Sequence, residues 1–337
     1  MTYALRRLLL TVPLLLAVSL VVFALASALP GDASVRRFDQ KGTPEERERW
    51  KEERGLNDAF LVRWGRYVWG VVAAGDFDKS YIDDEPVGGD LVAKLQATLE
   101  LTLVAMLLGT FVGLLVGILS AVFPRSPIDY LGNLIALMGI SFPVFWLGML
   151  LILFAVNTLG FAYSSSRYSP DFDLSHYVTH LYLLESLFHF DFDVFWDTSR
   201  HILLPALALS TIPMAVITRM TRSAMLEEID RDYARTARAK GLSARKVVLK
   251  HVLRNALIPI TTITGLQFGR LLGGAVLTET VFNWPGLGRF VVEKGVLGRD
   301  TPIIVGGILL SAATFVILNL VVDLLYALID PRIRRAA

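Results

Sequence analysis

The residues of this sequence that could do chemistry include a dense basic segment and a group of histidines. The segment from Arg219 to Asn255 holds ten Lys and Arg side chains, which suit contacts with an anionic membrane surface or another protein. His176 and His180 stand four residues apart with His189 nearby, a spacing that on a helix would offer two imidazoles to a metal ion. Histidines at this spacing more often form a plain polar face, so we expect no metal site.

Four polar side chains lie within otherwise apolar runs, namely Glu100, Gln267, Arg270 and Asp323. A charge in apolar surroundings is costly and therefore calls for a partner or a function. The charges could pair with one another and hold helices together, or Arg270 could line a passage and meet a carboxylate. We favour structural pairing, and the second interpretation stays open.

The composition places these residues in a membrane protein. Of 337 residues, 54% are hydrophobic and 19% are charged, which is more apolar than a soluble domain. The absence of cysteine excludes disulfides, thiolate metal sites and cysteine nucleophiles. The sequence lacks a G-x-x-x-x-G-K-[ST] phosphate loop, and Gly286-Leu287-Gly288 is too short for a dinucleotide fingerprint. We therefore expect neither a catalytic centre nor a bound cofactor in this chain.

Apolar runs long enough to cross a bilayer position these residues. A bilayer core about 30 Å thick needs roughly 20 apolar residues in a helix. The first run could be a cleaved secretory signal, but it is longer than the usual core of roughly 7–15 residues, which favours a retained anchor. Six runs predict an all-α integral membrane protein with about six transmembrane helices: Leu8–Leu29, Ala97–Phe123, Leu131–Leu159, His201–Arg219 (with Pro205 and Pro213, hence kinked), Ile258–Phe282 and Ile303–Ile329.

The distribution of Lys and Arg predicts the orientation of these helices. Both ends of the chain and the segment 219–255 are basic, whereas 161–200 holds two basic residues against six acids. Because short cytoplasmic loops are rich in Lys and Arg, we place both termini and the basic segment in the cytoplasm. The chain then divides into a first transmembrane helix (1–30), an external subdomain (31–96) with a helix around Pro44–Arg54, and five further helices (97–337) with a cytoplasmic loop (220–257).

Two of the predicted helices carry glycines at every fourth position. Glycines spaced in this way line one helix face and let a second backbone approach closely. The first set is Gly109, Gly113 and Gly117, and the second is Gly265, Gly269 and Gly273. We expect both sets to pack against other helices.

The cytoplasmic loop contains two short helices joined by a compact turn. The first is expected to end at Gly241, which suits a left-handed C-terminal cap, and the second to begin with Ser243 as N-cap. Lys246, Lys250 and Arg254 would share one face of the second helix. Its apolar face would comprise Val248, Val252, Ala256, Leu249, Leu253 and Leu257.

Three interpretations of this loop are open. It could lie on anionic lipid, it could simply be a long form of the basic segment that sets membrane orientation, or it could dock a cytosolic partner. The capped turn Lys240-Gly241-Leu242-Ser243 favours a rigid, protruding element, because an electrostatic anchor needs no such turn.

Motifs along nearly the whole chain carry a family resemblance. The run Asp232–Ser243, followed by His251-x-x-Arg254-Asn255-Ala256-x-x-Pro259, resembles the cytoplasmic loop of membrane subunits in ABC importers of the dipeptide/oligopeptide/nickel permease family. Arg235-Thr236-Ala237 stands where the wider superfamily has an acidic residue and two alanines. The segment 161–200 is the part of the chain that least resembles this family. Other matching motifs are Leu29-Pro30-Gly31-Asp32, Gly75-Asp76-Phe77 with Ser80 and Pro86-Val87, Ser141-Phe142-Pro143-Val144-Phe145-Trp146, Glu279-Thr280-Val281-Phe282-x-Trp284-Pro285-Gly286-Leu287-Gly288 and Asp330-Pro331-Arg332.

The resemblance implies that this chain forms half of a translocation pore in the plasma or inner membrane. Its loop helix would dock in a cleft of a separate ATP-binding subunit, with ATP and magnesium held there. Further expected partners are a homologous second permease subunit, a second ATP-binding subunit and an external substrate-binding protein, with no nucleic acid. The expected coupling contacts are Ala237, Arg238, Ala239, Lys240, Gly241, Leu242, Ser243 and Arg245.

Residues in the middle of the fifth predicted helix and at its external end are candidates for the pore or its gate. They are Gln267, Arg270, Glu279, Phe282 and Trp284. The segment 279–295 could be an ordinary aromatic membrane interface or a loop that dips back as an outer gate. Both interpretations stay open.

The resemblance favours import of di- or oligopeptides, with nickel or oligosaccharides as alternatives on the same architecture. An ion-coupled secondary transporter would show inverted repeats and acids near the bilayer midplane, and the sequence shows no evident repeat. An intramembrane enzyme would need a nucleophile and base, or metal ligands, within a span. The sequence offers neither.

Overall fold

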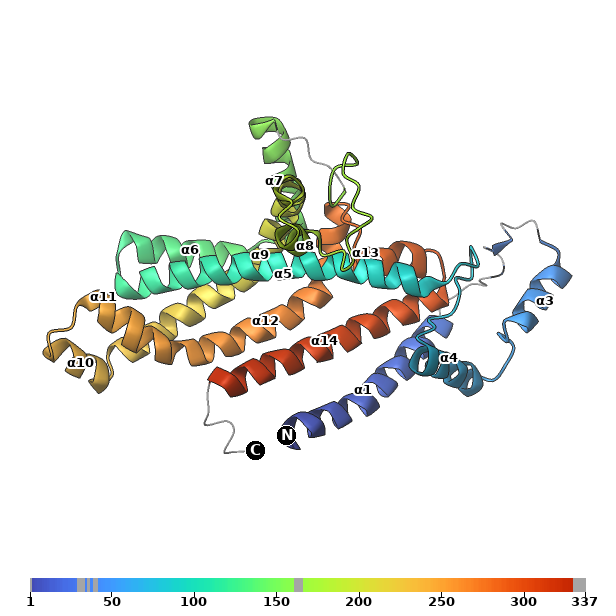
Figure 1. The fold of residues 1–337 in the computed structure, drawn as a ribbon, viewed down its shortest axis with the longest axis horizontal. Helices are drawn as coiled ribbons and strands as arrows, with labels where there is room; N and C mark the ends of the chain where they lie inside the picture. The colour runs from blue at the N-terminus through green and yellow to red at the C-terminus, as the bar shows by residue number, and fades with distance from the viewer. Residues whose placement is uncertain (1, 29–33, 35–36, 39–41, 161–165, 330–337) are drawn as a thin grey trace. The chain divides into compact units, whose positions relative to one another are not determined.

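The computed structural model describes residues 2–28, 34, 37–38, 42–160 and 166–329. These residues form helices and no strand beyond one isolated bridge between Lys79 and Pro86, so the all-α prediction is confirmed. Figure 1 shows the helices in chain order: α1 (Thr2–Ser27), α3 (Pro44–Glu53), α4 (Phe60–Ala74), α5 (Val87–Val122), α6 (Pro127–Ser141), α7 (Val144–Leu159), α8 (Tyr182–Phe188), α9 (Phe192–Ile229), α10 (Asp232–Ala239), α11 (Ala244–Lys246), a π-helix (Val247–Val252), α12 (Leu253–Val281), α13 (Leu287–Phe290), a second π-helix (Val291–Val296) and α14 (Thr301–Ile329).

Three described helices, α5, α9 and α14, are long and apolar enough to cross a membrane. The pair α6 and α7 makes a fourth crossing if the two count as one broken span. A shorter apolar helix covers Thr11–Ser27 within α1. The fifth predicted run lies in α12. This helix is long, but it is not among the described helices that are apolar enough to cross a membrane.

The prediction of one helix through Leu131–Leu159 is wrong. The chain bends by 110° between α6 and α7. Phe142, which precedes Pro143, is extended, with φ −87° and ψ 133°. The proline ring disfavours helical backbone at the preceding residue and removes one backbone donor, so the helix ends at Ser141.

Contacts divide the chain into two units, residues 1–98 with 285–317 and residues 99–284 with 318–337. In the second unit, α9 contacts α6, α7, α8 and α12. The first glycine set lies against it: a Cβ on Gly113 would stand 2.9 Å from the Met214 carbonyl oxygen, and one on Gly117 2.6 Å from Thr221 Cβ. Helix α5 can therefore approach α9 only where it lacks side chains.

The second glycine set behaves differently. Gly265 and Gly269 are buried in α12, whereas Gly273 is exposed and a Cβ placed on it would meet nothing within 4 Å. Within the described chain, this face of α12 is therefore covered over only part of its length.

The first unit is built around two apolar clusters. Val22 and Phe23 of α1 pack with Tyr67 of α4 and with Ile304 and Val305 of α14. A second cluster comprises Val87, Leu91, Leu287, Val291 and Ile303. A polar link accompanies the clusters, because the buried Asp300 carboxylate accepts hydrogen bonds from Ser80 Oγ (2.6 Å) and Tyr81 N (3.1 Å). Burial raises the pKa of Asp300.

Some predicted features fall outside the described residues. They are Leu29-Pro30-Gly31-Asp32, Asp330-Pro331-Arg332 with the basic tail, and the side chain of Asp323.

Candidate functional site

The basic loop forms a helical turn that joins α9 to α12 with almost no intervening linker. Two residues separate the end of α9 from the start of α10, and α11 runs through the π-helix into α12. Gly241 lies between them with φ +78°, the left-handed conformation predicted for it. The amides of Gly241 and Leu242 donate to the carbonyls of Arg238 (2.9 Å) and Ala237 (3.3 Å), which closes the end of α10.

Buried alanines and hydrogen bonds hold α10 against the end of α9. Ala234 is fully buried and Ala237 nearly so. Arg231 Nη2 donates to Glu227 Oε1 at 2.6 Å, and Tyr233 Oη donates to Glu228 Oε2 at 2.5 Å. These contacts make the turn a firm extension of α9 and leave Ala237 facing inward.

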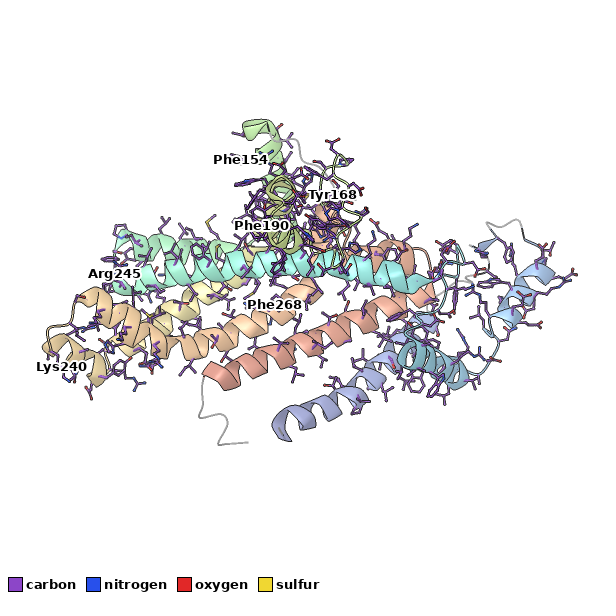
Figure 2. The ribbon with its side chains drawn as sticks, in the orientation of Figure 1. Phe154, Tyr168, Phe190, Lys240, Arg245 and Phe268 are labelled. Carbon is purple, nitrogen blue, oxygen red and sulfur yellow. The ribbon has the colours of Figure 1, made fainter. Side chains whose placement is uncertain are left out.

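Most of the other residues of the turn are exposed on the surface of the chain. Leu242 is half-buried, while Arg238, Ala239, Lys240, Gly241, Ser243 and Arg245 are exposed. Figure 2 shows Lys240 and Arg245 at the α10–α11 end of their unit. Neither forms an ion pair with any residue in the described part of the chain. The surface is cationic, capped and protruding, which suits a protein partner with acidic or polar groups.

The expected apolar face of the second loop helix is partly wrong. Val247, Val252 and Ala256 are buried, whereas Leu249 is 46% exposed. Residues 247–252 form a π-helix, so the buried positions are five apart at that point rather than four. A π turn carries no local sequence signal of its own, and the prediction assumed regular α geometry.

An ion pair that the sequence analysis missed lies between α6 and α9. Arg222 Nε and Nη2 donate to Asp129 Oδ1 and Oδ2 at 2.6 and 2.8 Å, in a bidentate pair. Arg125 N also donates to Asp129 Oδ2 at 2.9 Å, so both oxygens of this buried carboxylate have partners. Ser126 caps the start of α6, and Ser126-Pro127-x-Asp129 is a local pattern that could have indicated this helix start.

The pairing expected among the intramembrane charges is wrong for Glu100. Its carboxylate accepts from Arg167 Nη2 at 2.6 Å and from Leu183 N at 2.8 Å, in a buried site. Arg270 is exposed and forms no ion pair with a described residue. Gln267 is buried, and its Nε2 has no hydrogen-bond partner among the described atoms. The structure thus leaves Arg270 on an uncovered face of α12.

The other pore and gate candidates are buried within this chain. Glu279, Phe282 and Trp284 are at most 1% exposed. Trp284 N donates to the Glu279 carbonyl at 2.8 Å, and a Cβ on Gly148 of α7 would meet Phe282 at 2.8 Å. In this conformation these residues fasten the end of α12 and its contact with α7.

The histidine spacing does not occur on a helix. Residues 176–180 are irregular, and the rings of His176 and His189 lie 5.7 Å apart. Among the described residues, no three His, Cys, Asp or Glu side chains gather as metal ligands.

The described residues thus form a helical protein with several helices apolar enough to cross a membrane and an exposed cationic turn. Residues 113–335 match the family model "Binding-protein-dependent transport system inner membrane component", and 1–102 match the corresponding N-terminal model. The chain belongs to this family. It is a permease subunit of an ABC transporter in the inner membrane, has no catalytic role itself, and relies on partner ATPase subunits to handle ATP.

Individual relatives cover the whole chain. It is 42% identical to the dipeptide transport system permease protein DppB of Alkalihalophilus pseudofirmus, over 99% of both chains. It is also 42% identical to DppB of Escherichia coli K12, over 98% of both chains. It is 38% identical to the oligopeptide transport system permease protein AppB of Bacillus subtilis, over 98% of both chains. An inward-facing MetNI methionine ABC transporter shares the fold, with TM-score 0.54 and 20% identity over 71% of this chain and 96% of that one.

Proposed function

We propose that this chain forms half of the translocation pore of an ABC importer for di- and oligopeptides. The observation that carries the proposal is the full-length similarity, at 42% identity, to permeases named for dipeptide transport. The partners would be a homologous permease subunit, two ATP-binding subunits and an external substrate-binding protein.

The membrane arrangement in this proposal has about six crossings with both termini in the cytoplasm. The first crossing lies in α1, residues 31–96 face outward for the most part, and the loop 220–257 faces the ATPase. Three long apolar helices, the broken α6–α7 pair and the apolar part of α1 support five of these crossings. We assign the sixth to α12 on its length of 29 residues.

Coupling would pass through the turn around Gly241. Its exposed residues would contact an ATP-binding subunit, with Ala237 holding the turn in place from within. Because α10 is fastened to α9 and α11 continues into α12, a displacement of the turn would move two helices that pack extensively together. Arg270 on the uncovered face of α12 would then line the pore or meet the second permease subunit.

Uptake by the reconstituted transporter tests the proposal. Proteoliposomes that hold both permeases and both ATPases, with binding protein outside, are expected to accumulate a radiolabelled dipeptide only when ATP is enclosed. A proton gradient alone should give no uptake, which separates this mechanism from a secondary transporter. Accumulation of nickel or an oligosaccharide, but not of peptides, would contradict the assigned substrate.

A further inference from the structure

Helix α4, within the segment expected to be external, has two apolar faces. One face packs into the first unit through Phe60, Trp64, Tyr67 and Val71. The other carries four apolar side chains that nothing in the described chain covers: Leu61 (65% exposed), Val62 (54%), Trp69 (74%) and Val72 (75%). At about 100° per residue, these four positions fall within an arc of roughly 100°. We call them the α4 stripe.

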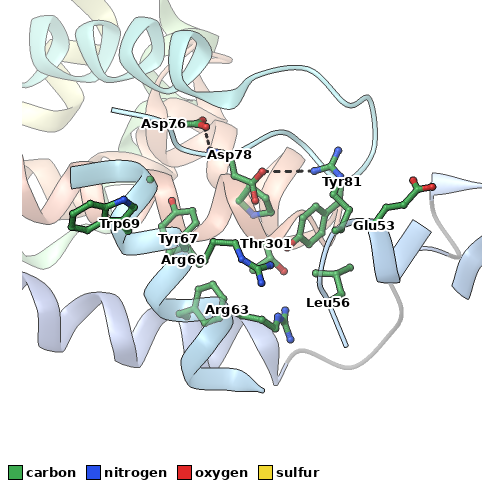
Figure 3. A pocket seen from close by; sticks show the side chains of 15 residues that line it. Glu53, Leu56, Arg63, Arg66, Tyr67, Trp69, Asp76, Asp78, Tyr81 and Thr301 are labelled. Carbon is green, nitrogen blue, oxygen red and sulfur yellow. Dashed lines mark hydrogen bonds and ion pairs between the residues drawn. The ribbon is translucent and has the colours of Figure 1, made fainter. Parts of the chain in front are cut away.

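The two edges between these faces differ in polarity. On one edge, Arg63 and Arg66 line a cavity of about 420 Å³ together with Asp76 and Asp78, and Trp69 of the exposed face borders the same cavity (Figure 3). On the other edge, Val68 lines an apolar cavity of about 300 Å³ between α1 and α14, and Val72 of the stripe lies at the rim of that cavity. The helix therefore has one charged side suited to water and an apolar side suited to hydrocarbon, which is the pattern of a helix lying in a membrane interface.

The contacts of α4 with α1 set its depth. The rings of Phe60 and Phe23 lie 5.7 Å apart, and Trp64 Nε1 donates to Ser19 Oγ at 3.1 Å. Phe23 and Ser19 precede the end of α1 at Ser27 by four and eight residues. At 1.5 Å per residue, these contacts lie about 6 and 12 Å below the outer end of the helix. Interfacial helices bury their apolar face by about 5–10 Å, so the Phe60 contact falls within this range and the Trp64 contact lies slightly deeper.

We propose that α4 lies within the outer leaflet of the bilayer and that the α4 stripe contacts lipid acyl chains. This inference rests on the proposed function in one respect, that α1 crosses the membrane. Helix α1 likewise exposes uncharged apolar side chains, with Val21 57% and Leu25 66% exposed. Lipid acyl chains are the natural contact for an uncharged surface that lies beside a membrane-spanning helix. Trp69 suits this depth because indole rings are enriched where hydrocarbon meets headgroups.

Spin labels can measure where the stripe lies, because the natural chain has no cysteine to remove. The variants Trp69→Cys and Val72→Cys would be labelled in the assembled transporter, reconstituted in phosphatidylcholine–phosphatidylglycerol vesicles. Glu45→Cys, on the exposed face of α3, serves as the water-facing control, and Val21→Cys on α1 as the membrane control. A gel-filtration profile like that of the unsubstituted transporter shows that each variant folds and assembles.

The expected result is that oxygen reaches the labels at positions 69 and 72 at least threefold better than at 45, while a water-soluble nickel chelate is largely excluded. Free access of the chelate to both positions would overturn the proposal. Exclusion of both reagents would also overturn it, since a protein would then cover the stripe. A lipid-exposed label at 21 with water-exposed labels at 69 and 72 contradicts this inference alone, whereas a water-exposed label at 21 contradicts the span proposed for α1.

Discussion

Gly113→Leu is expected to prevent the chain from accumulating in a folded form. A Cβ at this position would stand 2.9 Å from the Met214 carbonyl oxygen and 3.0 Å from Ile217 Cβ, so α5 would have to move away from α9. Overpacking costs about 1–3 kcal/mol where side chains can adjust. Here the nearest atom is the backbone carbonyl oxygen of Met214, which cannot move aside by changing rotamer. Leucine also adds three carbons beyond the Cβ. The measurement is the yield and thermal midpoint of the detergent-purified protein by size-exclusion chromatography.

Gly89→Leu is the matched control for this change. It adds the same side chain to the same helix, but a Cβ at Gly89 meets nothing within 4 Å. We expect its yield and thermal midpoint to stay near those of the unsubstituted chain. If Gly113→Leu behaved like Gly89→Leu, the close crossing of α5 and α9 would be refuted.

Gly241→Val is expected to abolish uptake while leaving the membrane helices folded. Gly241 has φ +78°, and a β-branched residue is a genuine outlier in that region. Left-handed backbone costs an ordinary L-residue roughly 1–2 kcal/mol, which lowers the equilibrium constant for forming the native turn about 5- to 30-fold. ATP-dependent uptake by reconstituted vesicles is the readout, and the yield and thermal midpoint of the purified permease report folding.

Gly241→Asn separates backbone strain from loss of the glycine itself. Asparagine tolerates the left-handed region, so this variant should retain most of the uptake. A built Cβ at Gly241 meets nothing within 4 Å, which leaves no clash inside the chain to confuse the comparison. Equal activity of the Val and Asn variants would show that the left-handed turn is not needed for transport.

Local chemistry explains which features could be predicted from the sequence. The all-α fold follows from apolar runs of sufficient length, and the turn at Gly241 follows from one residue with unusual conformational freedom. Prolines show the limit of such reasoning. Pro205 and Pro213 lie inside the continuous helix α9, while Pro143 follows the end of α6. Neighbouring helices decide whether the freed backbone groups are satisfied, and the sequence alone does not reveal those neighbours.

The ion pairs were beyond prediction for a different reason. Asp129 and Arg222 are 93 residues apart, and Glu100 and Arg167 are 67 apart. Many other acids and bases were available to each of them. Arg270 was expected to pair within the bundle, but α12 turns it to an uncovered face. Partner choice of this kind depends on how the helices pack, which no spacing rule encodes.

The central claim, that the turn around Gly241 contacts an ATP-binding subunit, can be measured directly by cross-linking. Single cysteines at Lys240 and Ser243, both exposed, would be treated with a short photoactivatable thiol reagent in membranes that hold the whole transporter. Asp58→Cys, in the segment before α4, is the control on the opposite side of the membrane. We predict that positions 240 and 243 yield a covalent product with the ATP-binding subunit and that position 58 yields none. Absence of that product at 240 and 243, or its formation from 58, would contradict the account.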